Sequence, residues 1–353
     1  MNNTKIRQIR HLGMHKQSHQ YWLDIMNHSK YLDKSIDCYN QGLLVDLLES
    51  RVAKLLGKEQ ALFVHKGTIA QLAAMKVASE SRDSKNIIIH PKSHIAIDEE
   101  NAYQVLIGLN GLTIGTDFEP FDFSMVESIT EKAAALIVEL PLRRVGFKLT
   151  PWDQLQQMSI WAKQSNTHFH MDGARLWEST HYYAKSLSEI SSLFDSVYVS
   201  LYKGLGGMNG SVLAGSFEFI EKCKLWRNRL GGNLWSAFPM LITALEGLDN
   251  NLEKIPTWVD RAHEIAKELI KIDGITVNQP QTNAFLIFVE GNRDSLNEKA
   301  QLLTQETGIK LFFKFNNTAN PNVQVTEIQV GADSVDITNV EITSYFNKLL
   351  AGI

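Results

Sequence analysis

The chain has 353 residues, of which 44% are hydrophobic and 21% charged, as in an ordinary soluble globular protein of one large or two smaller domains. Its net charge of −4 provides no general attraction to nucleic acids or anionic membranes, and no apolar run approaches the roughly 20 residues that span a bilayer. The N-terminus lacks the apolar segment of a secretory signal, and the two cysteines, Cys38 and Cys223, are far apart in the sequence. We therefore expect a cytoplasmic protein without disulfides, with no nucleic acid or membrane partner.

The first part of the chain alternates helical and strand patterns. Residues 1–40 are polar and irregular, and we expect an arm that packs on a partner subunit. Residues 43–57 have apolar side chains at helical spacing and end in a glycine, which predicts an amphipathic helix. A second helix is predicted over 149–164, with Thr150 as N-cap and Pro151 at its first position. Short apolar runs predict strands at 61–67, 86–90, 112–115, 135–140, 168–172, 196–202 and 211–216.

This alternation predicts an α/β fold with a large, mainly parallel sheet covered by helices on both faces. We place this large domain at residues 41–245. The rest of the chain, residues 246–353, is expected to form a smaller α/β domain. Its predicted strands alternate more cleanly between apolar and polar residues, which indicates one wetter face; they are 284–290, 309–315 and 323–330.

Polar residues follow several predicted strands, at the sheet edge where α/β proteins bind ligands. Gly67 and Thr68 stand between a strand and a helix, where free backbone N–H groups and a hydroxyl can bind an anion. His94 enters a helix after another strand, and its flat ring could stack on a planar cofactor. Taken alone, each feature is more often structural, as a capped helix or a hydrogen-bonded histidine.

Two further stretches place charged groups at strand ends. Asp172 closes the run "HFHMD", and the small residues Gly173 and Ala174 after it leave room for a flat group. Lys203 follows the apolar run 196–202 and precedes a group of glycines. Burying an ammonium group is costly unless it is paired or neutralised, so the position of this lysine requires an explanation.

Other sites that combine lysine with glycines fit this pattern less well. A phosphate-binding P-loop places its lysine after the glycines, and a dinucleotide loop needs GxGxxG with an acidic residue about 20 positions on. Lys203 could instead reach solvent with its stem packed on the strand. His168 and His170 alternate on one strand, but no acidic or cysteine partners stand at ligand spacing, so no metal site is predicted.

The four stretches form one site if the ligand is an aromatic aldehyde that carries a phosphate. A lysine that forms a Schiff base needs desolvated surroundings, which lower its pKa. A carboxylate opposite a pyridine nitrogen keeps that nitrogen protonated, so that the ring can withdraw electrons from a carbanion. The residues therefore predict a pyridoxal 5′-phosphate (PLP) site in which Lys203 is the covalent anchor and the glycines leave space for an incoming amine.

The segments "HMDGARLW" (170–177) and "SLYKGLGGMNGSVLAG" (200–215) resemble the threonine aldolase and β-eliminating lyase family of PLP-dependent enzymes. Further similarity covers 39–71, 92–100 and 226–234, and the resemblance is good over about 37–245. It implies fold type I, the aspartate aminotransferase fold, with a large mainly parallel sheet domain and a smaller C-terminal domain. It also implies a homodimer or homotetramer with sites at subunit interfaces.

The resemblance assigns roles to individual residues. It implies that Lys203 forms the Schiff base, Asp172 pairs with the pyridine nitrogen and His94 stacks on the ring. Arg175 matches an arginine near the phenolic oxygen of the cofactor and the substrate carboxylate. The cofactor-binding residues expected on this basis are Gly67, Thr68, His94, Asp172, Arg175, Ser200 and Lys203.

The departures from the family pattern concern the substrate. Where the family reads Glu-Asn-Thr-His, this chain reads "ELPLRRVG" (139–146), so the histidine associated with the substrate hydroxyl is absent. The carboxylate-binding arginine is replaced by Glu327, and the arginine that reaches a neighbouring subunit's phosphate falls near Trp235. One of Arg143 and Arg144 is then our candidate for binding the small amino acid substrate, with Arg143 preferred by alignment. The alternative is that both are surface charges that pair with Glu139 or a neighbouring subunit.

The sequence therefore predicts a PLP-dependent lyase that cleaves a β-hydroxy-α-amino acid, such as threonine or allo-threonine, to glycine and an aldehyde. Another PLP-dependent reaction of amino acids is an alternative, namely β-elimination, racemisation or transamination. A protein that keeps the fold and cofactor but binds without catalysing is a further alternative. An absorbance scan and product analysis with a panel of amino acids separate these possibilities.

Overall fold

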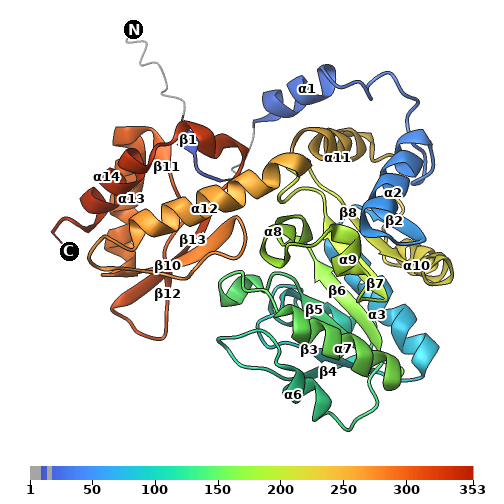
Figure 1. Cartoon of the computed structure of the whole chain (residues 1–353). Coiled ribbons are helices and arrows are strands. Elements are labelled where there is room, and N and C mark those ends of the chain that lie inside the picture. Colours follow the sequence, from blue (N-terminus) through green and yellow to red (C-terminus); the bar gives the residue numbers. More distant parts are fainter. Residues whose placement is uncertain (1–8, 14–17, 353) are drawn as a thin grey trace. The chain divides into compact units, whose positions relative to one another are not determined.

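The computed structural model describes residues 9–13 and 18–352, whose contacts divide into two units (Figure 1). The larger unit comprises residues 18–253, and the smaller unit comprises 254–352 together with 9–13. The sequence places a domain boundary near residue 245, whereas the contacts divide the chain between Glu253 and Lys254. Within the described residues, every helix is too short or too polar to cross a membrane.

The N-terminal segment, expected as one arm over residues 1–40, is divided between the two units. Residues 9–13 belong to the smaller unit, where β1 (Arg10–His11) pairs with β11 (Ile309–Lys310) in a parallel two-stranded sheet. In the larger unit, α1 (His19–Asn27) begins at its N-cap Ser18. Residues 1–8 and 14–17 lie outside the described part, and packing of the arm on a partner subunit stays a prediction.

A seven-stranded sheet forms the centre of the larger unit. Only β8 runs antiparallel to its neighbours in this sheet, and the other strand pairs are parallel, as the sequence predicts. Every residue of β6, β7 and β8 is buried, which explains the apolar centres of β7 and β8, whereas β6 alternates histidine and aspartate with apolar residues. The strand order is β2 (Gln60–Val64), β8 (Ser211–Gly215), β7 (Ser196–Ser200), β6 (His168–Gly173), β5 (Ala135–Glu139), β3 (Asn86–Ile89) and β4 (Asn110–Thr113).

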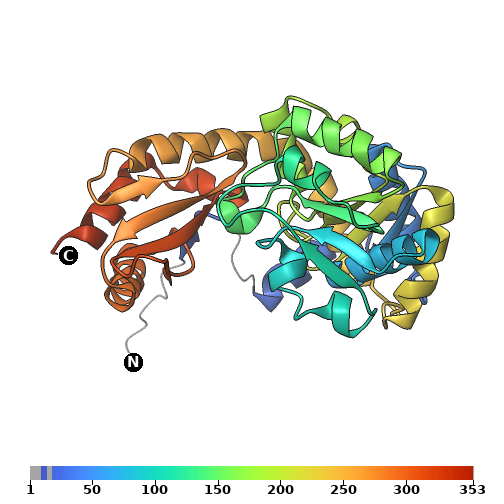
Figure 2. The same ribbon diagram turned by 90° about the horizontal axis from the view of Figure 1, so that it is seen from below.

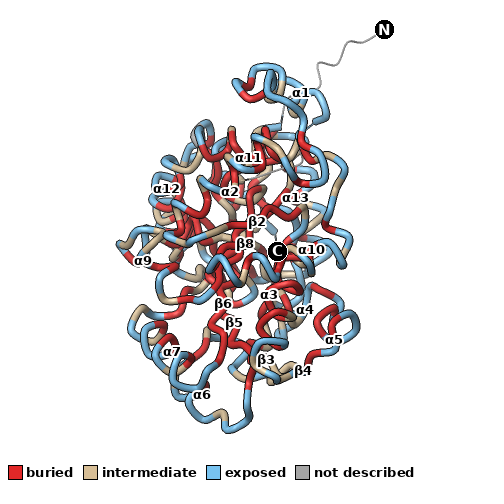
Figure 3. The backbone as a smooth tube through the Cα atoms, turned by 90° about the vertical axis from the view of Figure 1, so that its right-hand side faces the viewer, coloured by how far each residue is buried: buried red, intermediate tan, exposed pale blue. Residues whose placement is uncertain are grey.

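Helices cover both faces of this sheet, and Figure 2 shows α7 (Trp152–Gln164) and α3 (Gly67–Arg82) on opposite sides of it. Buried residues follow the strands and the inward sides of the helices (Figure 3). The other helices of the unit are α2 (Leu43–Leu56), α4 (His94–Ile97), α5 (Ala102–Val105), α6 (Phe123–Glu127), α8 (Thr180–Tyr183), α9 (Leu187–Ser191), α10 (Phe217–Arg229) and α11 (Phe238–Asn250). Short 3₁₀ turns occupy Arg143–Val145, Leu176–Glu178 and Leu252–Lys254.

Of the two helices predicted from the sequence, α2 has the predicted end and α7 does not have the predicted start. α2 ends at Leu56, and Gly57 caps it in the left-handed conformation with φ of 62°, which confirms the predicted end. The predicted start of α7 is wrong, because Pro151 is itself the N-cap in an extended conformation and no side chain caps the helix. Thr150 precedes the N-cap by one residue and is buried. Its carbonyl accepts a hydrogen bond from the Tyr183 hydroxyl at 2.6 Å.

The smaller unit contains a four-stranded antiparallel sheet and three long helices. Along β13, buried and partly exposed residues alternate, which confirms the predicted wetter face. The strand order is β12 (Asn316–Asn317), β13 (Val323–Gln329), β10 (Ala284–Glu290) and β9 (Ile275–Val277). The helices are α12 (Ile255–Leu269), α13 (Arg293–Thr307) and α14 (Asn339–Leu350), and a 3₁₀ turn spans Ala332–Asp336.

The strand predicted over residues 309–315 is largely wrong. Only Ile309 and Lys310 are in a strand, and they pair with β1 rather than with the main sheet of the unit. Phe312 and Phe315 are buried by aromatic packing instead, with their ring centroids 4.7 Å apart. A run of apolar residues shows burial but does not distinguish a strand from an irregular segment packed on a helix.

Candidate active site

A cavity of about 170 Å³ in the larger unit lies where several strands of the sheet end. Pairing between neighbouring strands sets Glu139, Asp172 and Tyr198 side by side across β5, β6 and β7. All three side chains line the cavity. The lining residues that the sequence predicts for the site are Gly67, Thr68, His94, Arg143, Asp172, Arg175 and Lys203.

Lys203 lines the cavity just beyond the end of β7. Burial and the nearby Arg175 guanidinium lower the pKa of Lys203 to about 8, although the carboxylates of Asp172, Glu139 and Glu178 act in the opposite direction. A substantial fraction of this amine is therefore neutral near physiological pH, as a nucleophilic lysine requires. The lowered pKa reduces the cost of placing a cation here, because burial favours the uncharged form more than solvent does.

The glycines after Lys203 do not leave open space, contrary to our interpretation of the sequence. A Cβ atom on Gly204 would overlap the carboxylate of Glu178, and one on Gly207 would lie 2.8 Å from the Leu201 carbonyl oxygen. These glycines are required because buried protein groups approach their backbone closely. The structure therefore explains them by packing around the lysine and not by room for a ligand.

Asp172 is 2% exposed near the end of β6, and its two oxygens have different partners. Oδ1 accepts a hydrogen bond from the Ala174 backbone N–H at 3.2 Å, and Oδ2 accepts one from Gln71 Nε2 at 2.5 Å. No cation bonds this carboxylate directly among the hydrogen bonds and ion pairs described. It is thus a fixed, buried acceptor beside the cavity, suited to a positively charged ring nitrogen.

His94 is held by two carboxylates at the start of α4. Its backbone N–H donates to Glu139 Oε2 at 2.7 Å, and its Nδ1 lies 2.9 Å from Oε1 of the buried Glu99. The hydrogen bond to Glu99 raises the pKa of His94 above its ordinary value. The hydrogen bond to Glu99 therefore holds the orientation of the ring, and His94 lines the cavity.

The start of α3 provides a seat for an anion. Lys66 is the N-cap of this helix and its side chain makes no cap bond; the Ile69 N–H donates to the Lys66 carbonyl at 3.1 Å, while the N–H groups of Gly67 and Thr68 have no acceptor among the hydrogen bonds of the described residues. Such unpaired donors, together with the helix dipole, favour a bound phosphate. Gly67 is required here because a Cβ atom on it would overlap the hydroxyl of Tyr198.

Two arginines from the segment 139–146 line the cavity. Arg143 donates its backbone N–H to Glu139 Oε1 at 3.2 Å, so one partly buried carboxylate holds both this segment and His94. Arg144 forms a two-pronged ion pair with Asp98, with Nε 2.9 Å from Oδ2. The burial of Glu139 and the nearby Asp172 raise the pKa of Glu139 to about 7.

Several lining residues are missing from the sequence prediction, namely Lys66, Asp98, Glu139, Tyr198 and Tyr202. Gln71, which contacts Asp172 directly, is also missing. One signal could have found it, because Gln71 stands one helical turn after the predicted anion seat at Gly67 and Thr68 and therefore on the same side of α3.

Three residues named from the sequence lie elsewhere in the described structure. Ser200 is buried in β7 outside the cavity lining, and its Oγ accepts a hydrogen bond from the Tyr202 backbone N–H at 3.4 Å. Trp235 is 66% exposed and contacts the ring of Tyr39. Glu327 lies in β13 of the smaller unit and accepts a hydrogen bond from Gln329.

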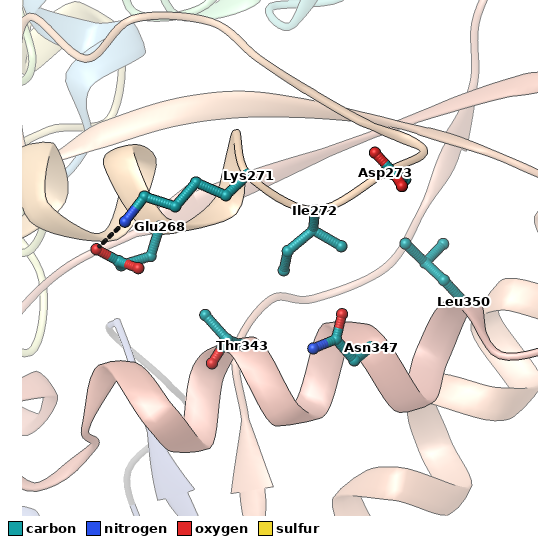
Figure 4. A pocket seen from close by; sticks show the side chains of 7 residues that line it. All are labelled: Glu268, Lys271, Ile272, Asp273, Thr343, Asn347 and Leu350. Carbon is teal, nitrogen blue, oxygen red and sulfur yellow. Dashed lines mark hydrogen bonds and ion pairs between the residues drawn. The ribbon is translucent and has the colours of Figure 1, made fainter.

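A second cavity, of about 400 Å³, lies in the smaller unit near the C-terminal ends of α12 and α14 (Figure 4). Two charged side chains of its lining, Lys271 and Glu268, form an ion pair with an N–O distance of 2.8 Å. The remaining lining residues are Ile272, Asp273, Thr343, Asn347 and Leu350. This lining offers no buried lysine, histidine or arginine, so the candidate active site is the cavity at Lys203.

The sequence matches the model of the beta-eliminating lyase family over residues 34–292. The chain belongs to this family. It is 29% identical to low-specificity L-threonine aldolase 1 of Arabidopsis thaliana over 277 residues, which cover 75% of this chain and 77% of that protein. These findings confirm the predicted family.

Two solved structures are similar over almost the whole chain. A predicted L-allo-threonine aldolase of Listeria monocytogenes EGD-E has a TM-score of 0.91 and 29% identity, with 97% of this chain and 96% of that one covered. A predicted aromatic amino acid β-eliminating lyase/threonine aldolase of Exiguobacterium sp. 255-15 has a TM-score of 0.91 and 26% identity, with 98% of both chains covered. The family member described here thus has fold type I of PLP-dependent enzymes, as predicted.

Proposed function

We propose that the protein is a PLP-dependent carbon–carbon lyase that cleaves a β-hydroxy-α-amino acid, of the threonine or allo-threonine type, to glycine and an aldehyde. The observation that carries this proposal is one cavity lined by Lys203, whose pKa is lowered to about 8, and by the buried carboxylate of Asp172. The similarity to proteins named as threonine aldolases supports the choice of reaction within the family.

The residues of the cavity fit PLP. The unpaired N–H groups at the start of α3, with Gly67, Thr68 and Lys66, would hold its phosphate. Asp172 would hold the ring nitrogen, and the ring of His94 would pack on the cofactor. When bound, the cofactor supplies an electron-withdrawing ring that stabilises negative charge at the substrate Cα.

The protein side chains would orient the substrate and move its protons. Arg175 and Arg143 would bind the α-carboxylate, because guanidinium groups bind carboxylates in a fixed, two-pronged geometry. Lys203 would hold the cofactor aldehyde and, when not bonded to it, would be available as a base. His94 is hydrogen-bonded to Glu99 through Nδ1. We assign proton transfer in the cavity to His94, because the histidine that the family associates with the substrate hydroxyl is absent from this chain.

The function is tested by incubating the purified protein with PLP, recording its absorbance spectrum, and analysing products from a panel of amino acids. A visible band together with glycine and acetaldehyde from threonine or allo-threonine is expected. Pyruvate and ammonia from serine would indicate β-elimination, and an inverted enantiomer would indicate racemisation. A protein that binds no PLP would overturn the proposal.

The pH dependence of cofactor loading reports on Lys203. The rate at which PLP produces a visible band should rise with pH around a midpoint near 8, because only the neutral amine reacts and its pKa is lowered to about 8. An ordinary lysine would give a midpoint near pH 10.4. Arg175→Gln should move the midpoint upward, because this guanidinium is one cause of the lowered pKa. Stopped-flow absorbance measures it, and a midpoint above about 10 in the unchanged protein would contradict the prediction.

The arginine pair provides a matched test of substrate binding. Arg143→Ala should weaken binding of the best amino acid substrate by about one to two orders of magnitude, the effect of losing a charged hydrogen bond, while the visible band persists. Arg144→Ala is the control, because the Arg144 side chain bonds to Asp98. Spectral titration with the amino acid gives both affinities. Equal affinities in the two variants would place the carboxylate elsewhere.

We also propose a homodimer or homotetramer in the cytoplasm. Exposed apolar side chains near the start of α2 support an association surface, since Leu43 is 54% exposed, Tyr39 51% and Trp235 66%. Large exposed apolar side chains that gather in one place are typical of interfaces. Sedimentation velocity should give at least twice the monomer mass of 39.9 kDa, and a monomer would contradict the proposal.

A further inference from the structure

A chain of polar side chains lies behind Asp172. Gln71 Nε2 is 2.5 Å from Asp172 Oδ2, and Gln71 Oε1 is 2.6 Å from His170 Nε2. His170 Nδ1 is 2.7 Å from Ser196 Oγ, and the same oxygen is 2.6 Å from His168 Nε2. Four consecutive hydrogen bonds thus connect the carboxylate to a histidine at the other end of β6.

The sequence spacing explains how this chain forms. His168, His170 and Asp172 alternate along β6, so their side chains lie on one face of the sheet. α3 packs on the sheet and brings Gln71 to the same face, where it bridges His170 and Asp172. Ser196, from the neighbouring strand β7, bridges the two histidines.

All members of the chain are buried. Gln71, His170 and Ser196 are 0% exposed, Asp172 is 2% exposed and His168 is 3% exposed. Water therefore does not compete for their hydrogen bonds, and each donor must face an acceptor.

This requirement fixes the direction of every hydrogen bond. Gln71 donates its amide N–H to Asp172, so its oxygen faces His170 and His170 carries its proton on Nε2. His170 Nδ1 is then an acceptor for the Ser196 hydroxyl, and the serine oxygen accepts from His168 Nε2. All four donors point along the chain toward Asp172, and hydrogen bonds aligned in this way strengthen one another.

The histidines must stay neutral for this arrangement to persist, and their surroundings favour that form. Burial lowers the pKa of His170 well below its ordinary value, with a smaller contribution from His168. Burial, with the positive charges of Arg82 and Lys58, lowers the pKa of His168 to about 3. The ring of Phe219 stacks on His168 at 4.6 Å, and Asp195 Oδ2 is 3.9 Å from its Nδ1.

We propose that Gln71 and His170 are positioning residues that hold the Asp172 carboxylate in one orientation, so that it can keep the cofactor ring nitrogen protonated. The inference rests on the proposed function. It gives a role to the two histidines of β6, which do not form a metal site in our interpretation of the sequence. Gln71 acts on Asp172 directly, and His170 acts through Gln71.

The first test needs no cofactor. Nitrogen NMR of the protein labelled with ¹⁵N-histidine, with signals assigned by His168→Gln and His170→Gln, reports the protonated nitrogen of each ring. Both rings should be neutral with the proton on Nε2 from about pH 5.5 to 9. A proton on Nδ1 of His170, or a ring that becomes charged in this range, would overturn the proposed direction of the chain.

The second test compares Gln71→Leu and His170→Phe with His90→Phe. His90 is also a buried histidine, directly after β3, but the hydrogen bonds described for its ring go to the Glu119 carbonyl and the Lys92 backbone N–H. In PLP-loaded enzyme, Gln71→Leu should reduce kcat about 10- to 100-fold with KM little changed, and His170→Phe by a smaller factor. His90→Phe should leave kcat within about twofold. His170→Gln, which keeps an N–H donor, should recover much of the loss.

A spectroscopic readout separates this role from a structural one. In Gln71→Leu, the alkaline pH at which the bound-cofactor spectrum changes should fall by about one unit or more, because a carboxylate that is no longer held in one orientation stabilises the ring proton less well. If Gln71→Leu and His90→Phe behave alike in spectrum and kcat, the proposal is wrong although the function may stand. If the unchanged protein neither binds PLP nor forms product, the proposed function fails, while the NMR result still decides the direction of the chain.

Discussion

Replacing Lys203 by alanine abolishes the visible absorbance band of bound PLP and reduces turnover to background, which is the largest effect we expect. The band requires a covalent bond between the cofactor aldehyde and an amine, and Lys203 is the partly buried amine just beyond the end of β7 with a pKa near 8. The variant should still fold, because the carbonyl of residue 203 keeps its hydrogen bond from the Gly206 N–H.

A second amine makes this prediction sharper. Lys66 also lines the cavity, beside the expected phosphate seat. Lys66→Ala should keep the visible band while PLP binds less tightly, and it is therefore the matched control. Borohydride reduction followed by peptide mapping identifies the labelled lysine. Label on Lys66 in the unchanged protein, or a band that survives in Lys203→Ala, would show that the anchor is wrongly assigned.

Asp172→Asn should fold normally and bind PLP but lose most turnover. Its side-chain oxygen can still accept from the Ala174 N–H, so the local backbone contact is retained. The neutral amide cannot hold the ring nitrogen protonated, and loss of a buried charge pair costs about 3–5 kcal/mol. If this cost falls entirely on the transition state, kcat drops by a factor on the order of 10² to 10³·⁵.

A second buried aspartate in the same unit controls for loss of stability. Asp37 is 3% exposed, and its carboxylate accepts hydrogen bonds from the Ser236 hydroxyl and the Ala237 N–H. Asp37→Asn should reduce thermal stability and leave kcat nearly unchanged, whereas Asp172→Asn should do the reverse. Steady-state kinetics and thermal unfolding of both variants measure the two effects. Near-normal turnover in Asp172→Asn would make this carboxylate structural.

The sequence by itself predicted the strands of the larger unit and two of its helices. Buried strands of a parallel sheet are rich in apolar residues, so the runs at β5 and β7 and the shorter pattern at β6 were visible without coordinates. The carboxyl ends of such strands share one edge, so Asp172 and Lys203 could be expected to meet. The structure places both at one cavity.

Local patterns failed where packing between distant segments decides the outcome. The run 309–315 is apolar because Phe312 and Phe315 pack against other aromatic rings, and only its first two residues form a strand. From the sequence we interpreted the glycines after Lys203 as leaving space for a ligand. In the structure the backbone of Gly204 instead lies in close contact with the Glu178 carboxylate. The sequence shows that a residue is small or apolar. Only the tertiary structure shows which neighbouring group requires a residue of that kind.

The electrostatics of the site were decided by the tertiary structure alone. The bond between Gln71 and Asp172 joins residues 101 positions apart, and it exists because α3 crosses the sheet above β6. Likewise, Glu139 joins His94 to Arg143 because two loops converge on one strand end. A hydrogen bond acts over about 3 Å, so its presence depends on the final placement of both partners, whereas hydrophobic periodicity is a property of each segment on its own.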